Sequence, residues 1–209
     1  MKKTLVLVAL FGLPIVAYLF FASGVHDFAK LPLLNEDKLE LEGFRDLDGE
    51  LVSLDGQITI VGYYGFNPAD FSGHAYNLSG KIYDNFYKYL DFQVVILVPE
   101  GTQDQVKELE GQLHQITNPL KWKFAFGEPE TIEAFFQQMG TNLSLSSELS
   151  SPYVFIIDKE GRLRGRKDDQ DKGLMYGYDT RSVAELDDKM DDDVKVLLAE
   201  YRMALKKNN

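Results

Sequence analysis

His74 is the side chain with the clearest potential for chemistry in this sequence. An imidazole can bind a metal ion, exchange a proton near neutral pH or form hydrogen bonds. One interpretation makes His74 part of a metal site, together with the thioether of Met139 or Met175. The other places it at the first turn of a helix as a capping or lining residue, because a histidine without a regularly spaced ligand rarely forms a metal site. His26 and His114 are expected to lie in solvent.

A run of aspartates near the C-terminus raises the question of a calcium site. These residues are Asp187, Asp188, Asp191, Asp192 and Asp193. Their spacing lacks the glycine and the terminal glutamate of a calcium-binding loop. We therefore interpret them as the solvated face of an amphipathic helix, whose N-terminal end favours negative charge.

The composition excludes several classes of function. The chain has 209 residues and no cysteine, which rules out disulfides, thiolate nucleophiles and thiolate-bound metals. A thiol oxidoreductase or peroxidase would need such a nucleophile, so we expect no enzyme of that kind. The formal net charge is −11, whereas binding to nucleic acid requires a basic surface. The sequence also lacks a phosphate-binding glycine loop and a nucleophile-elbow motif.

Aromatic side chains gather around a loop that contains Asn67 and Pro68. They are Tyr63, Tyr64, Phe66, Phe71 and Tyr76. Such side chains either belong to the core or, when exposed on a loop, act as anchors of a partner-binding surface. The residues that we consider for partner binding are Tyr64, Phe66, Asn67, Phe71 and His74.

The elements that position these residues alternate between strands and helices. Apolar runs rich in β-branched and aromatic residues predict strands at 58–64, 92–98 and 122–126, and a β-hairpin at 153–165. Helical periodicity predicts helices at 74–90, 102–116, from Pro129 onward and at 181–206. The order indicates an α/β domain with a central mixed sheet covered on both faces.

Two details of this pattern are specific enough to check. Residues 39–54 alternate around Asp48-Gly49, which predicts a further β-hairpin. The helix at 74–90 places Leu78, Ile82, Phe86 and Leu90 on one face, which should therefore be buried.

The first thirty residues predict a membrane anchor or a signal segment. The uncharged run from Leu5 to Ala22 is nearly long enough to span a bilayer as a helix. Lys2 and Lys3 should remain in the cytoplasm, which places the rest of the chain outside it. We favour an uncleaved transmembrane helix because the run exceeds the usual signal core, and the alternative is a signal peptide cleaved at the small residues Ala22-Ser23-Gly24. Residues 31–37 would then form a tether, and residues 38–209 the folded domain.

The C-terminal half carries a family resemblance. Residues 155–165 read F-I-I-D-K-E-G-R-L-R-G and are followed by Tyr178-Asp179-Thr180 and an acidic final helix. Together with residues 44–54, this stretch resembles the SCO/SenC family. The resemblance covers roughly residues 38–206 and implies a thioredoxin-like fold on the outer side of a respiratory membrane. It also implies a link to the copper site of cytochrome oxidase, to which this family delivers copper or whose thiols it reduces.

At the positions where that family has its copper-binding side chains, this chain has residues that cannot bind copper. The family has a C-x-x-x-C-P motif after the first core strand, and the best superposition places Ala69 and Gly73 at the two cysteines. Its histidine ligand precedes the strand at 153, where this chain has Ser151 and Pro152. Copper(I) prefers sulfur or imidazole ligands, which these residues do not offer. If the resemblance holds, residues 65–74 and Pro152 should meet in space.

These observations favour a membrane-anchored, exported protein with a degenerate site. We expect a non-catalytic binding or assembly factor linked to respiratory cytochrome oxidase, with a protein partner and no cofactor. The alternative is a copper metallochaperone that uses histidine and methionine ligands, with His74 as the metal ligand. The expected location is the inner membrane of a bacterium, with the C-terminal domain in the periplasm.

Overall fold

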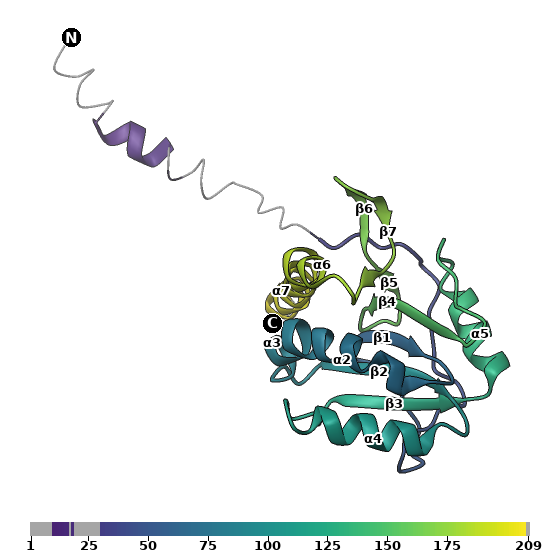
Figure 1. Ribbon diagram of the computed structural model, residues 1–209. Helices are drawn as coiled ribbons and strands as arrows, with labels where there is room; N and C mark the ends of the chain where they lie inside the picture. Colours follow the sequence, from purple (N-terminus) through teal and green to yellow (C-terminus); the bar gives the residue numbers. More distant parts are fainter. Residues whose placement is uncertain (1–9, 17, 19–29, 208–209) are drawn as a thin grey trace, which may run out of the picture.

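A mixed sheet of six strands lies at the centre of the computed structural model, which describes residues 10–16, 18 and 30–207 (Figure 1). The strands follow the order β3-β2-β1-β4-β5, and β8 pairs with β4 outside that path. β1, β2 and β3 are parallel, whereas β4 runs antiparallel to β1. The bounds are β1 Ile58–Tyr64, β2 Phe92–Pro99, β3 Trp122–Gly127, β4 Ser150–Ile157, β5 Leu163–Arg164 and β8 Tyr178–Asp179. The expected mixed sheet is confirmed.

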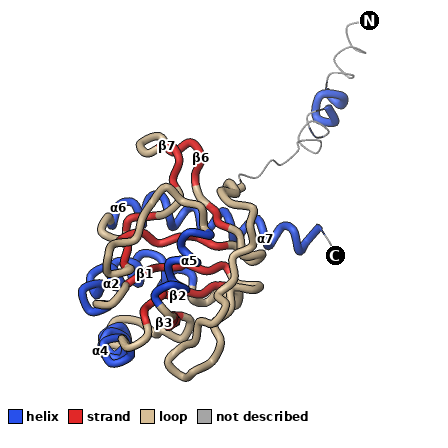
Figure 2. The backbone as a smooth tube through the Cα atoms, turned by 90° about the vertical axis from the view of Figure 1, so that its right-hand side faces the viewer, coloured by secondary structure: helices blue, strands red, loops and turns tan. Residues whose placement is uncertain are grey.

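Helices cover both faces of this sheet (Figures 1 and 2). Two π-helical turns, Ser79–Tyr83 and Leu186–Met190, continue α2 into α3 and α6 into α7. The helices are α2 Ser72–Leu78, α3 Asp84–Phe86, α4 Gln103–Leu113, α5 Pro129–Gln138, α6 Val183–Glu185 and α7 Asp191–Lys207. The buried residues of α2, α3, α4 and α7 pack on one face, and those of α5 pack on the other.

The alternation of side chains along β1 divides the core into two layers. Ile58, Ile60 and Tyr64 belong to the layer beneath α2, α4 and α7. Val61 and Tyr63 belong to the layer beneath α5. All seven residues of β1 are buried, as expected of a central strand covered on both faces.

The helix predicted at 74–90 ends earlier than its periodicity indicated. α3 ends at Phe86, and the Leu90 side chain is 90% exposed. Leu78, Ile82 and Phe86 are buried as predicted. Leu90 falls in the turn that enters β2, where the helical period no longer determines which way a side chain faces.

The hairpin predicted within residues 39–54 is present only close to its turn. Gly49 occupies the turn with φ +83°, and Arg45 and Leu51 form an antiparallel bridge across it. The Asp46 N–H donates to the Glu50 carbonyl at 2.9 Å, and the Val52 N–H donates to the Phe44 carbonyl at 3.1 Å. Arg45 also pairs with Phe126 at the free edge of β3. The alternating apolar residues pack this segment against the sheet, and those that are buried are Leu39, Leu41, Phe44, Val52 and Leu54.

Residues 31–37 belong to the domain and are not a free tether. Leu31 is 3% exposed and lies in the core layer beneath α7. The Leu34 N–H donates to the Leu163 carbonyl at 2.9 Å, so the backbone follows the outer edge of β5. We call residues 31–37 the strap. The structure therefore moves the start of the folded domain from residue 38 to residue 31.

The predicted anchor falls partly outside the described residues. Of the run from Leu5 to Ala22, the structure describes residues 10–16 and 18, and residues 10–16 are helical. Among the helices in the described part of the chain, none combines the length and the hydrophobicity needed to cross a membrane.

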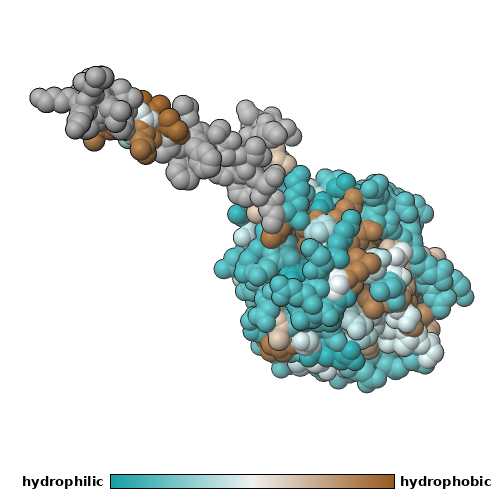
Figure 3. All heavy atoms as spheres, turned by 90° about the horizontal axis from the view of Figure 1, so that it is seen from above, coloured by the Kyte–Doolittle hydropathy of each residue, from teal (hydrophilic) through white to brown (hydrophobic). Residues whose placement is uncertain are grey.

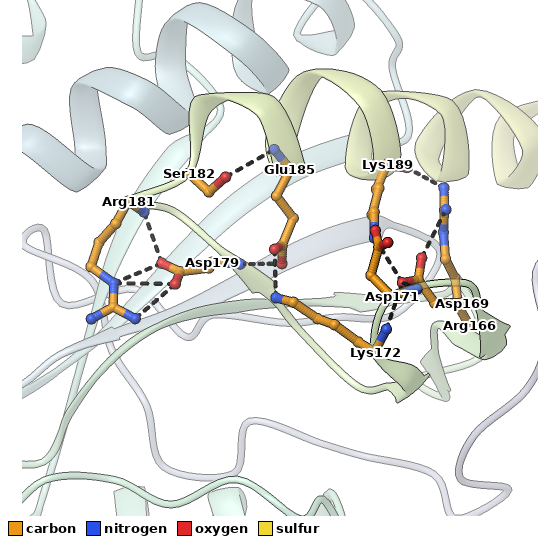
Figure 4. A network of polar contacts seen from close by, with 9 residues as sticks. All are labelled: Arg166, Asp169, Asp171, Lys172, Asp179, Arg181, Ser182, Glu185 and Lys189. Carbon is orange, nitrogen blue, oxygen red and sulfur yellow. Dashed lines mark hydrogen bonds and ion pairs between the residues drawn. The ribbon is translucent and has the colours of Figure 1, made fainter.

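A small second sheet projects from the domain and was not predicted. It consists of β6 (Arg166–Asp169) and β7 (Gly173–Met175) (Figures 1 and 2). Ion pairs fasten this hairpin to the start of the C-terminal helix (Figure 4). Lys189 contacts Asp169 at 2.7 Å, and Lys172 contacts Glu185 at 2.5 Å. β6 consists of charged residues only, so the sequence has no hydrophobic pattern that would predict a strand there.

The aspartates at 187–193 are not all on a solvated face, which corrects that interpretation. Asp191 and Asp193 are each only 7% exposed. Asp193 accepts hydrogen bonds from Arg166 at 2.6 Å and from the Tyr178 hydroxyl at 2.5 Å. Asp193 therefore joins the C-terminal helix to β6 and β8.

The face of the domain seen from above is mainly hydrophilic, with a narrower band of hydrophobic residues (Figure 3).

Candidate functional site

The loop that follows β1 contains most of the residues selected from the sequence. Gly65 turns the chain with φ +62°, and the Phe66 N–H donates to the Glu148 carbonyl at 3.1 Å. A Cβ atom at residue 65 would lie 2.0 Å from that same carbonyl oxygen. Pro68 then starts a 3₁₀ turn, Pro68–Phe71, which leads directly into α2. This geometry requires glycine at the first position of the loop.

A second loop, immediately before β4, forms the neighbouring wall of the site. Ser150 and Ser151 pair with Tyr64 and Tyr63 at the end of β1. Leu149 is buried and has φ +58°, a left-handed conformation that costs roughly 1 kcal/mol or more for a residue with a side chain. The strained turn directs the preceding carbonyl toward the β1 loop. The two loops are therefore locked together through backbone atoms.

Thr180 connects both loops to the beginning of α2. Its hydroxyl lies 2.7 Å from the Pro152 carbonyl and 2.7 Å from Nδ1 of His74. Its own carbonyl accepts a hydrogen bond from the side chain of Asn77 at 2.9 Å. The expectation that Pro152 and the loop at 65–74 meet in space is thus confirmed. The sequence did not single out Thr180 as a site residue, because nothing local to it indicates a contact with α2.

Three aromatic rings of the predicted cluster form a stack that ends at the surface. Tyr64 and Phe71 are stacked with centroids 4.9 Å apart, and Phe71 lies 4.7 Å from the His74 ring. Tyr64 is only 1% exposed, so the expectation that it binds a partner is wrong. Its hydroxyl has no hydrogen-bond partner among the described residues, and burial raises the pKa of this phenol well above its usual value.

The exposed members of the cluster lie around the mouth of the loop. Phe66 is 37% exposed, Asn67 is exposed, and Phe71 and His74 are half-buried. Tyr76 faces away toward α4, where its hydroxyl donates to Gln112 at 2.9 Å. We call Phe66, Asn67, Phe71 and His74 the docking surface.

The positions expected for metal ligands carry no donor side chain. Ala69 and Gly73 are exposed, Ser151 is buried, and Pro152 is half-buried. Within the described residues, no group of three or more histidine or acidic side chains is arranged to hold a metal ion. At this end of the sheet, His74 is the side chain best suited to bind copper.

Neither methionine considered as a partner for His74 is placed to act with it. Met139 lies in the opposite core layer, where its sulfur accepts the Tyr63 hydroxyl at 3.8 Å. Met175 is buried in the core at the end of β7. Nδ1 of His74 is already engaged with Thr180. The combination of His74 with either thioether is therefore not assembled.

The electrostatic environment favours an uncharged His74. Partial burial lowers the pKa of the imidazole, and the nearby Arg181 guanidinium lowers it further. Asp179 has the opposite effect, but it forms an ion pair with Arg181 at 2.7 Å. The Asp179 N–H donates to the Glu185 carboxylate at 2.8 Å. Glu185 also pairs with Lys172, so this part of the site is connected to the ion pairs of the β6–β7 hairpin (Figure 4).

Solved structures with the same arrangement of elements include an oxidase assembly protein and a protein assigned to disulfide exchange. One is BsSco, a member of the Sco family of cytochrome c oxidase assembly proteins, with 17% identity and a TM-score of 0.54 over 81% of this chain and 98% of that chain. Another is a protein from Bacteroides thetaiotaomicron assigned as a disulfide isomerase, with 10% identity and a TM-score of 0.54 over 84% of this chain and 98% of that chain.

These similarities show the fold, which is thioredoxin-like with a mixed sheet between two layers of helices. No protein-family model and no curated protein sequence matches the chain. The chain has no cysteine, although its structural neighbours include thiol-disulfide proteins. The chain thus shares the fold of these proteins but has none of the cysteines that thiol-disulfide chemistry requires.

Proposed function

We propose that this protein is a non-catalytic binding factor that assists the assembly of a respiratory cytochrome oxidase. The observation that carries the proposal is a loop that is fixed in place but has no thiol at either of the expected cysteine positions. Ala69 and Gly73 stand where the related family has cysteines, yet the loop remains fixed by Phe66 on one side and His74 on the other. A fixed surface with a partly exposed aromatic residue, Phe66, is suited to bind a protein.

The proposed partner follows from the similarity to BsSco, which belongs to a family of cytochrome c oxidase assembly proteins. The location follows from the N-terminal sequence. We propose that the run from Leu5 to Ala22 anchors the chain in a bacterial inner membrane, with Lys2 and Lys3 on the cytoplasmic side and the domain in the periplasm. A factor held there could reach the copper-containing part of the oxidase.

A complementation experiment tests the proposal through Phe66. In cells that lack the gene, we expect less assembled oxidase, measured by haem absorption and by oxidase activity. The wild-type gene should restore it, whereas Phe66→Asp should not, because the new carboxylate would have to be desolvated at the interface. Both proteins should accumulate to the same level, since Phe66 is already partly exposed.

Leu120→Asp is the matched control for Phe66→Asp. Leu120 is 79% exposed and lies two residues before the start of β3, which places it at the opposite end of the parallel strands from the docking surface. We expect it to restore oxidase assembly fully. Equal restoration by both variants would contradict the assignment of the docking surface, and normal assembly without the gene would contradict the proposed function.

A further inference from the structure

The proton positions around Thr180 follow from its two short contacts. The threonine hydroxyl has a single proton and lies 2.7 Å from both the Pro152 carbonyl oxygen and Nδ1 of His74. A carbonyl oxygen can only accept a hydrogen bond. If the hydroxyl proton pointed elsewhere, two oxygens 2.7 Å apart would face each other with no proton between them. Thr180 therefore donates to Pro152 and accepts from the Nδ1–H of His74.

This arrangement determines the tautomer of the neutral imidazole. With its proton on Nδ1, His74 carries an unprotonated Nε2 with a free lone pair. Nε2 has no hydrogen-bond partner among the residues that the structure describes, and the ring is partly exposed. The lone pair is thus available to a molecule that approaches the docking surface.

The surroundings keep the ring in this orientation. Thr180 is 1% exposed, and its N–H donates to the same Pro152 carbonyl at 2.9 Å. Asn77 holds the Thr180 carbonyl from the next turn of α2. Phe71 covers one face of the imidazole. A hydrogen-bonding group fixed in this manner costs little conformational entropy when it binds a partner.

We infer that Nε2 of His74 is the hydrogen-bond acceptor of the docking surface and takes an O–H or N–H donor from the protein partner. This inference rests on the proposed function, to which it adds the chemistry of the partner. The partner segment must present a hydroxyl or an amide N–H beside an apolar group that contacts Phe66. A carboxylate at that position binds only if the imidazole takes up a second proton, which partial burial and the nearby Arg181 oppose by lowering the pKa of His74.

The tautomer can be measured without knowing the partner. We expect long-range proton–nitrogen NMR correlation of the full-length chain in detergent micelles, with nitrogen-15-labelled histidine, to show Nδ1 protonated and Nε2 unprotonated in His74. Thr180→Val removes the acceptor and should abolish this preference, whereas Thr180→Ser should keep it. A protonated Nε2 in the wild-type protein, or an unchanged spectrum in Thr180→Val, would overturn the inference.

Chemical modification tests whether the lone pair is accessible. Diethyl pyrocarbonate acylates unprotonated imidazole nitrogens, and mass spectrometry can locate the product. We expect His74 to react at a rate comparable to that of the exposed His114. Protection of His74 while His114 reacts would show that Nε2 is not presented and would overturn the inference. If both NMR and modification agree with the expectation but cells without the gene assemble the oxidase normally, the proposed function fails and the tautomer and accessibility of His74 stand.

Discussion

We expect a chain that begins at residue 38 to unfold roughly 10 °C below a chain that begins at residue 30, since each kcal/mol shifts the midpoint by about 2–4 °C at this size. The difference is the strap. Its removal exposes the core around Leu31, which is worth about 2–3 kcal/mol. It also takes the Leu31 carbonyl away from the buried Arg164 guanidinium, which lies 2.7 Å from it, at a cost of about 1–3 kcal/mol. The conformational freedom that the strap regains offsets part of this loss.

Thermal unfolding followed by circular dichroism compares the two chains directly. Leu31→Ala in the longer chain is the informative intermediate, because it removes the side chain and keeps the backbone contacts of the strap. It should melt between the other two. Equal midpoints for the chains that begin at 30 and 38 would show that the strap does not stabilise the domain.

Gly65→Ala should destabilise the protein by on the order of 3 kcal/mol or more, because it combines a steric clash with a strained backbone. The added Cβ would lie 2.0 Å from the carbonyl oxygen of Glu148 and 3.0 Å from Cβ of Ser150. That carbonyl cannot withdraw without breaking its hydrogen bond from the Phe66 N–H. The φ of +62° is unfavourable for alanine as well. Chemical denaturation would measure the loss.

Gly73→Ala provides the control within the same loop region. Nothing lies within 4 Å of a Cβ atom at Gly73, and this residue is part of α2. The substitution should be neutral or stabilise the helix by about 0.5–1 kcal/mol. A Gly65→Ala protein as stable as Gly73→Ala would mean that the two loops are not locked together as the structure has them.

The central strands could be predicted because their sequences are continuous apolar runs. Residues 58–64 are β1 exactly as bounded in the structure, and 92–98 differ from β2 by a single residue. The local pattern in residues 39–54 predicted the turn at Gly49 correctly but not the extent of the hairpin. The alternation continues beyond the paired residues because the apolar side chains pack on the sheet, where Arg45 also pairs with Phe126 of β3.

The strap and the β6–β7 hairpin could not be predicted from local sequence patterns for a different reason. Their structure depends on charged or backbone partners that are remote in the sequence. Lys189 reaches Asp169 from α6–α7, and the strap follows β5 through backbone hydrogen bonds that carry no side-chain signature. No periodicity in residues 31–37 or 166–175 indicates these partners.

The location of the site was accessible from the sequence, whereas its internal contacts were not. The resemblance placed Pro152 beside the loop at 65–74, and this is confirmed through Thr180. The burial of Tyr64 could have been predicted because it ends a continuous apolar strand that is covered on both faces, and the two-residue alternation places it in the same core layer as Ile60. The hydrogen bond between His74 and Thr180 joins residues 106 positions apart, so no local sequence pattern could predict it.

The absence of a copper-transfer site is the central claim, and competition for Cu(I) tests it most directly. The measurement titrates the purified domain, beginning at residue 30, against a chromogenic Cu(I) chelator of known affinity. The resemblance of the sequence to the SCO/SenC family implies a copper site of two thiolates and one imidazole, whereas the matching positions here are Ala69, Gly73 and the Ser151–Pro152 segment. The loss of both sulfur ligands should lower the affinity by many orders of magnitude. We predict no one-to-one complex in competition with the chelator, and no change in His74→Ala. Tight one-to-one binding that disappears in His74→Ala would contradict the account and establish copper as the ligand of this site.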